Sequence, residues 1–183
     1  MHQDQASKNL SKRLGARHAL YESIKTHPVV YVTRDIERAL GIEPANGYHI
    51  VTNDSAYAQE ILKKHPKNVH IIKQAKKGNQ NEPLDTHELL SEADTVKLIK
   101  KLEARIVVFK PTVQIEEICK AQGWELLNPD AQLSRIVEEK ISQVDWLGEH
   151  RHLLPPHTIV TCKELTWDNL KYVVQFNHGH TGE

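Results

Sequence analysis

Short apolar runs rich in β-branched residues alternate, between residues 29 and 130, with stretches whose apolar residues recur at helical spacing. The runs predict strands, and the stretches between them predict helices. The predicted strands are 29–33, 48–54, 68–74, 104–111 and 124–130, and the predicted helices are 55–65, 86–103 and 112–122. Strands that alternate with helices are typical of a parallel sheet covered by helices on both faces. We therefore expect a doubly wound, mostly parallel, Rossmann-like α/β domain.

Polar residues follow the predicted strands, where sheets of this kind bind their ligands. Aspartates stand at three of these positions, namely Asp35, Asp54 and Asp130. Asp54 and Asp130 each precede a predicted helix, and we interpret both as helix caps, with Ser55 as the alternative to Asp54. Asp35 precedes only a short helical segment and is assigned no role. The first strand is not followed by GxGxxG, so we expect no dinucleotide-binding loop there.

The pattern changes after residue 130. Apolar residues recur at helical spacing over residues 131–150, which predicts one long helix. A Pro-Pro break follows, and then two strand-like runs, 158–167 and 171–177, that predict an antiparallel hairpin. We therefore expect three parts: a charged helical lead-in at 1–28, the α/β domain at 29–130, and the start of an incomplete second domain at 131–183.

Composition excludes several classes of protein. The 24 basic and 24 acidic residues balance, which argues against a partner such as nucleic acid that requires a basic face. The two cysteines form no CxxC pair, which favours a reducing, cytoplasmic location. No apolar run approaches the ~18 residues of a membrane helix. The apolar hairpin would expose a strand edge, which favours self-association into a homodimer.

Three segments of the second part carry a resemblance to a known family. These segments are PDAQLSRIVEEKISQ, LLPPH and VVQFNHGHTGE. Four features follow one another along the chain: a doubly wound lead domain, a helix bearing a lysine, an LPP turn, and a strand that runs into a glycine-containing loop. This order resembles that of the ATP-grasp ligases over residues 29–183. The resemblance implies a pre-ATP-grasp domain followed by the first part of the ATP-grasp domain, interrupted within its glycine-rich loop at Glu183.

The resemblance implies which residues contact ATP. In the family, a glycine-rich loop between antiparallel strands folds over the triphosphate, and lysines upstream of the loop contact phosphate oxygens. Glycines leave backbone N–H groups free to point at an anion. The implied ATP-binding residues are Lys140, Gln175, His178, Gly179, His180, Thr181 and Gly182. Gln175 departs from the family, because many members have a second lysine there.

The resemblance also implies an activity. A family enzyme uses Mg²⁺ and ATP to activate a small carboxylate as an acyl phosphate, which an amine or another nucleophile such as a thiol then displaces. The magnesium ligands of such enzymes lie later than residue 183, so no catalytic residue is assigned in this chain. The chain by itself is therefore expected to be inactive.

Other interpretations remain open. The chain could be a stand-alone doubly wound module that binds a small ligand or a partner at its strand ends without catalysis. His178 and His180, with His157, form a second candidate, since alternating imidazoles on an extended segment suit zinc. Cys119 or Cys162 as a nucleophile is a third, although both are expected to be small core or interstrand residues.

Overall fold

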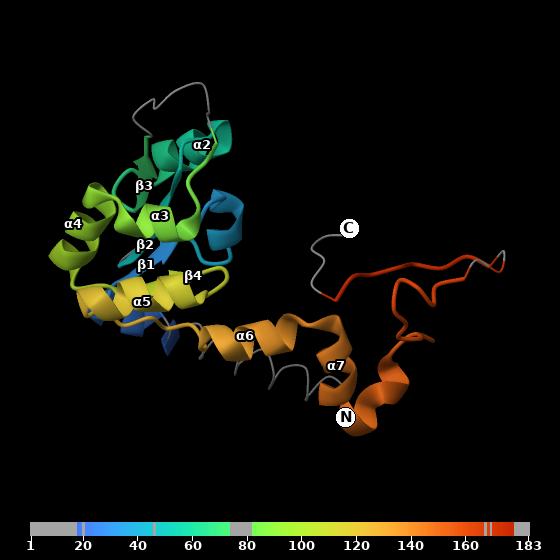
Figure 1. Cartoon of the computed structure of the whole chain (residues 1–183). Coiled ribbons are helices and arrows are strands. Elements are labelled where there is room, and N and C mark those ends of the chain that lie inside the picture. The colour runs from blue at the N-terminus through green and yellow to red at the C-terminus, as the bar shows by residue number, and fades with distance from the viewer. Residues whose placement is uncertain are drawn as a thin grey trace, which may run out of the picture. The chain divides into compact units, whose positions relative to one another are not determined.

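A computed structural model describes residues 18–177 except residues 20, 46, 74–81, 167 and 169. Figure 1 shows the elements in chain order: β1 (Val29–Val32), the 3-10 helix η1 (Ile36–Ala39), β2 (Tyr48–Asn53), α2 (Ala56–Lys64), β3 (Val69–Ile72), α3 (Thr86–Ser91), α4 (Ala93–Leu102), β4 (Arg105–Val108), α5 (Val113–Gln122), α6 (Ala131–Glu138), α7 (Lys140–Trp146) and the 3-10 helix η2 (Gly148–Leu153). The chain separates into residues 1–129, here called the sheet unit, and residues 130–183, here called the C-terminal unit. No helix in the described part of the chain is long and apolar enough to cross a membrane.

The sheet unit is built on a four-stranded parallel sheet with the strand order β3-β2-β1-β4. This confirms the predicted α/β class and four of the predicted strands. The fifth predicted strand, 124–130, forms only one parallel bridge, between Ile106 and Leu126. Beyond it, the Asn128 side chain takes the place of a backbone partner, since it accepts from the Val108 amide and donates to the Val108 carbonyl at 2.9 Å each.

Helices cover both faces of the sheet, because successive strand residues point to opposite sides. On the first face, Val30 and Val32 of β1 pack with Leu90 of α3, Ile99 of α4 and Ile115 of α5. On the second face, other strand residues pack with the helical segment 21–26, η1 and α2. The carboxyl-terminal end of the predicted lead-in thus packs on the sheet, whereas residues 1–17 and 20 lie outside the described part.

One predicted helix is divided in the structure. The stretch 86–103 forms α3 and α4, separated at Glu92, whose backbone is extended with φ −64° and ψ 136°. The Ser91 hydroxyl donates to the carbonyl of His87 at 2.9 Å just before the break. The change of direction brings the buried residues of both helices into the same core on the first face of the sheet. Core packing therefore outweighs the continuous helical pattern.

The predicted helix 131–150 is also divided, into α6, α7 and η2. The first break lies at Glu139, with φ −66° and ψ 118°. The two amides that follow it, those of Lys140 and Ile141, donate to Asn177 at 3.2 and 3.0 Å. A contact from a distant part of the C-terminal unit therefore satisfies N–H groups at the start of α7.

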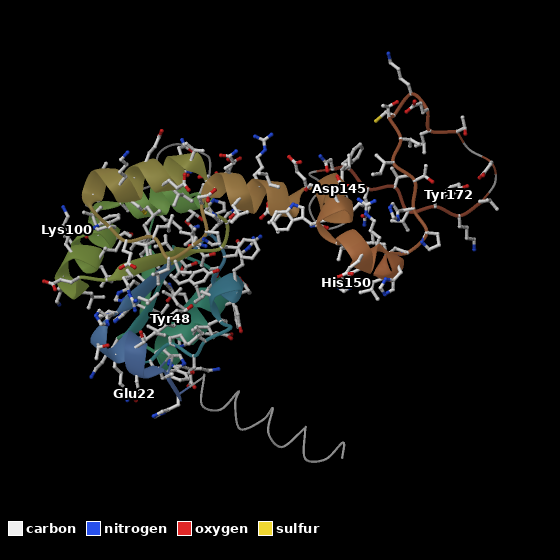
Figure 2. The ribbon with its side chains drawn as sticks, turned by 90° about the horizontal axis from the view of Figure 1, so that it is seen from below. Glu22, Tyr48, Lys100, Asp145, His150 and Tyr172 are labelled. Carbon is white, nitrogen blue, oxygen red and sulfur yellow. The ribbon has the colours of Figure 1, made fainter. Side chains whose placement is uncertain are left out.

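The predicted hairpin is not shown by the structure and stays a prediction. The only strands among the described residues are β1 to β4 of the sheet unit. The Asp168 carboxylate accepts from the amide of Leu170 at 3.1 Å, as in a side-chain-stabilised turn. The segment after this turn is extended and exposed, and Val173 is 88% exposed. In Figure 2, the ribbon around Tyr172 forms an open loop without a helix or a strand, whereas Tyr48 lies among the packed elements of the sheet unit.

Candidate functional site

Lys140, the first predicted ATP-binding residue, lies at the start of α7 and is half-buried. Its backbone N–H donates to the Asn177 carbonyl at 3.2 Å, and the next amide, that of Ile141, donates to Asn177 Oδ1 at 3.0 Å. Asn177 directly precedes the predicted glycine-rich loop. The backbone that carries Lys140 is thus hydrogen-bonded to the residue from which the predicted loop departs.

The other predicted ATP-binding residues are distributed as follows. Gln175 lies in the exposed, extended segment two residues before Asn177. The loop residues His178, Gly179, His180, Thr181 and Gly182 lie outside the described residues. Asn177 itself was missed by the sequence reasoning. An asparagine directly before a glycine-bearing segment is a signal that could have found it, because asparagine side chains often bond to nearby backbone groups.

The surroundings of Lys140 are charged and polar. The Glu139 carboxylate lies 3.8 Å from Arg135 Nε, and Glu138 is also adjacent in sequence. A lysine ammonium is a mobile point charge that suits a flexible phosphate group. No group of three or more His, Cys, Asp or Glu residues in the described part of the chain could hold a metal ion.

The carboxyl edge of the sheet is internally hydrogen-bonded. Asn53 is 6% exposed, and its side-chain amide donates to the carbonyls of Arg34 and Leu84 while its oxygen accepts from the Leu84 amide. Arg34 pairs with Asp85 at 3.1 Å. The polar groups after β1 and β2 thus hold together the loops at this edge.

The three aspartates after strands have different roles. Asp130 accepts from the amide of Leu133 at 2.6 Å and caps α6, as predicted. Of the two predicted caps of α2, the Ser55 hydroxyl is the one that caps the helix, and Asp54 instead accepts from the side chain of Gln59. Asp35 pairs with Arg38 at 3.3 Å.

The alternative interpretations named two cysteines and a histidine that lie in separate segments of the described chain. Cys119 is buried in α5, as predicted, and burial raises the pKa of its thiol, which disfavours the reactive thiolate. Cys162 is exposed, and its expected placement as a core or interstrand residue stays a prediction, since the structure does not show the hairpin that would contain it. His157 is exposed, with Nδ1 2.9 Å from the carbonyl of Pro155.

A pair of histidines joins β2 and β3. The rings of His49 and His70 stack with centroids 5.4 Å apart, and Nδ1 of His49 lies 3.2 Å from Nε2 of His70. Burial lowers the pKa of both imidazoles, and that of His70 to about 4, with a further contribution from His49. The bond needs a lone pair on one of the two facing nitrogens, so both rings cannot be protonated while it persists, and protonation of either ring places positive charge in a half-buried site.

Because of this histidine pair, we expect the folded protein to be less stable at acid pH. The folded pKa of His70, about 4, is below the value of 6.5 expected for the unfolded chain. The unfolded state therefore binds the proton first, and stability that is full above pH 6.5 falls as the pH drops toward 4. Allowing for the partly solvated ring, we expect a loss of about 1 to 2 kcal/mol. Urea unfolding at pH 7.5 and 4.5 should show a smaller difference for His70→Gln than for the wild type, and an equal difference would contradict the assignment.

Comparison with protein-family models, curated proteins and solved structures gave no match to this chain. Function is therefore inferred from the geometry of the two units and from the segments that resemble the ATP-grasp ligases. The contact between Asn177 and the start of α7 is the observation that bears most directly on that resemblance.

Proposed function

We propose that the chain is the amino-terminal part of an ATP-dependent ligase of the ATP-grasp type, which joins a small carboxylate to an amine or a thiol. One observation carries the proposal: Asn177 accepts hydrogen bonds from the amides of Lys140 and Ile141. In the family, the lysine of this helix and the glycine-rich loop contact the same triphosphate. The proximity of Lys140 to the residue before the loop is the arrangement that this role requires.

The exposed apolar surface of the C-terminal unit supports the proposal as well. Ala131 is the only buried residue among those described in this unit. Its exposed large apolar residues are Leu133, Ile136, Val137, Ile141, Trp146, Leu153, Ile159, Val160, Leu165, Leu170, Tyr172, Val173, Val174 and Phe176. An exposed apolar surface of this kind marks an interaction site. We interpret it as the face on which the rest of an ATP-grasp domain packs, with 158–167 and 171–177 then pairing as a hairpin.

The proposed reaction has two steps. A carboxylate oxygen attacks the γ-phosphorus of ATP, the bond to the β,γ-bridging oxygen breaks, and ADP leaves. The amine nitrogen or thiol sulfur then attacks the acyl carbon, loses its proton and expels phosphate. In this chain, the Lys140 ammonium would hold a phosphate oxygen and the amides of 178–182 would cover the phosphates. Bound magnesium would neutralise phosphate charge, and no step is assigned to it, because the described residues form no group of three or more possible ligands.

A stand-alone binding module is the second candidate. It is favoured by the sheet unit, whose two core clusters lie on the two faces of its own sheet. A domain with its own hydrophobic core can fold alone. This candidate predicts that removal of the chain after about residue 155 leaves folding and ligand binding intact.

Hydroxylamine trapping on the protein isolated from its native source tests the ligase proposal. With Mg²⁺, ATP and a pool of small carboxylic acids, we expect ADP and acyl hydroxamates to form together. Lys140→Met should lower kcat/KM for ATP by about 10- to 100-fold, because a charge-assisted contact to phosphate is lost. Lys163→Met, which neutralises an exposed lysine of the same unit, should change it by less than about twofold.

The intact mass of the native protein distinguishes the two candidates independently of any substrate. A mass greater than the 21.0 kDa of this chain by a domain or more supports the ligase. A mass equal to 21.0 kDa, together with the absence of hydroxamate, overturns the ligase proposal and leaves the binding module.

A further inference from the structure

A recess of about 290 Å³ opens on the second face of the sheet unit, over β1 and β4. Val29 and Tyr31 of β1 and Arg105 and Val107 of β4 contribute to its floor. These residues share one face because they alternate along paired parallel strands, in which Val29 lies opposite Arg105 and Tyr31 opposite Val107. Figure 2 labels Tyr48, which also lines the recess from β2.

The recess is open because the connection from β1 to β2 is unusually small. A crossover between parallel strands usually contains an α-helix that packs on the sheet. Here it contains η1, a 3-10 helix of four residues. Together with the helical segment 21–26, η1 packs on part of this face and leaves the area between β1 and β4 accessible.

The lining of the recess is apolar with an excess of positive charge. Among the described residues that line it, two are arginines, Arg38 and Arg105, and none is a carboxylate. The Arg105 side chain donates from Nη2 to the carbonyl of His27 at 3.0 Å, while its Nε is buried without a hydrogen-bond partner in the described part of the chain. Both guanidinium groups are permanently charged, so the recess favours an anion.

Arg38 is held in an orientation that suits an anion. Its guanidinium carbon lies 4.2 Å from the ring centroid of Phe109, and its Nε lies 3.3 Å from Asp35 Oδ2. Stacking on a ring leaves the N–H groups in the guanidinium plane, where a carboxylate binds them side by side. The pair with Asp35 is about half exposed, so solvent screens the competing carboxylate.

Tyr31 adds a neutral donor beside this charge. Its hydroxyl forms no hydrogen bond within the described part of the chain, whereas the neighbouring Tyr48 hydroxyl donates to the carbonyl of Ala39 at 2.8 Å. Burial raises the pKa of Tyr31 while the charge of Arg38 opposes the rise, so the hydroxyl keeps its proton at neutral pH and lies within electrostatic range of Arg38.

We propose that this recess binds a small carboxylic acid with an apolar body. Arg38 and the Tyr31 hydroxyl bind the carboxylate, and the body packs on Val29 and Val107. The volume of the recess is at the lower limit of that of ligand pockets. This restricts the apolar body of the ligand to about the size of one aromatic ring or a short branched chain. The site involves no nucleotide and does not rest on the ligase proposal.

Titration of the whole chain with benzoate, isovalerate and the uncharged benzamide tests the site, with binding followed by calorimetry and by NMR. We expect both acids to bind and benzamide to bind at least about tenfold more weakly, since it lacks the charge that Arg38 pairs with. Arg38→Met should weaken benzoate binding at least about tenfold, and Tyr31→Phe about threefold. Arg34→Met is the matched control, because Arg34 also follows β1 but pairs with Asp85 and does not line the recess.

Three results would overturn the proposal. The first is that neither acid binds at about 10 mM, a concentration above the millimolar range of weak sites. The second is equal affinity for benzoate and benzamide. The third is an equal loss of benzoate affinity in Arg34→Met and Arg38→Met. Thermal unfolding of each variant checks that it is folded. Tyr31→Phe keeps the ring that packs on the sheet, so it decides the question if Arg38→Met does not fold.

Discussion

Replacement of Gly47 by alanine is expected to destabilise the protein by about 3 kcal/mol or more. Gly47 has φ +93°, which alanine rarely adopts, and an added Cβ would lie 2.3 Å from the carbonyl oxygen of Ile24. The backbone has little room to relax, because the Gly47 carbonyl accepts from the amide of Val29 at 2.8 Å at the start of β1. Urea unfolding at neutral pH measures the change in the free energy of unfolding.

Gly123→Ala is the matched control for this substitution. Gly123 also has a positive φ, +70°, at the end of α5, but an added Cβ there meets no atom within 4 Å. The strained backbone alone should then cost about 1 kcal/mol. If the two substitutions destabilise equally, close packing of Gly47 on Ile24 does not determine the effect.

Asn53→Ala is expected to cost about 3 kcal/mol, the second large effect. The substitution removes one acceptor and two donors at a site that is 6% exposed, and it leaves the Leu84 amide and the carbonyls of Leu84 and Arg34 without these partners. Leaving a buried polar group without a partner costs more free energy of unfolding than a hydrogen bond normally contributes. The same urea experiment measures the loss.

Asn68→Ala provides the comparison for Asn53. Asn68 is half-buried and its side chain donates once, to the carbonyl of Tyr48 at 3.0 Å. Its loss should cost about 1 kcal/mol. A cost for Asn53→Ala no larger than that of Asn68→Ala would mean that water replaces the missing bonds and that the carboxyl edge is not held by Asn53.

The proposals for the two units fail independently. The ligase proposal concerns Lys140 and the residues near it in the C-terminal unit, and its readout is ATP-dependent hydroxamate formation. The acid-binding recess concerns Arg38 and Tyr31 of the sheet unit, and its readout is benzoate affinity without nucleotide. A chain that binds benzoate but belongs to no ligase would match the binding-module interpretation.

Local pattern was sufficient for much of the sheet unit. The β-branched runs that contain β1 to β4 were predicted because a strand buried on both faces needs a continuous apolar run. The end of α5 was predicted because glycine readily adopts the positive φ found at Gly123. The capping role of Asp130 followed from its place before a helical pattern.

The candidate site was only partly predictable. Lys140 and Gln175 were predicted to be site residues from a resemblance. Asn177 is identified only by its two hydrogen bonds to the start of α7. The recess was not predicted either. Its arginines follow β1 and begin β4, and no local spacing relates Arg38 to Arg105, because strand pairing brings these parts of the chain together.

The sequence by itself determined the type and order of most elements in the sheet unit, because hydrophobic period and capping act over a few neighbouring residues. Tertiary structure decided where continuous patterns break. Glu92 interrupts one helix so that two helices share a core, and Glu139 interrupts another where Asn177 supplies acceptors. Tertiary structure also left the recess open beside a four-residue crossover. These outcomes depend on contacts between residues far apart in the chain, whose energies no local pattern contains.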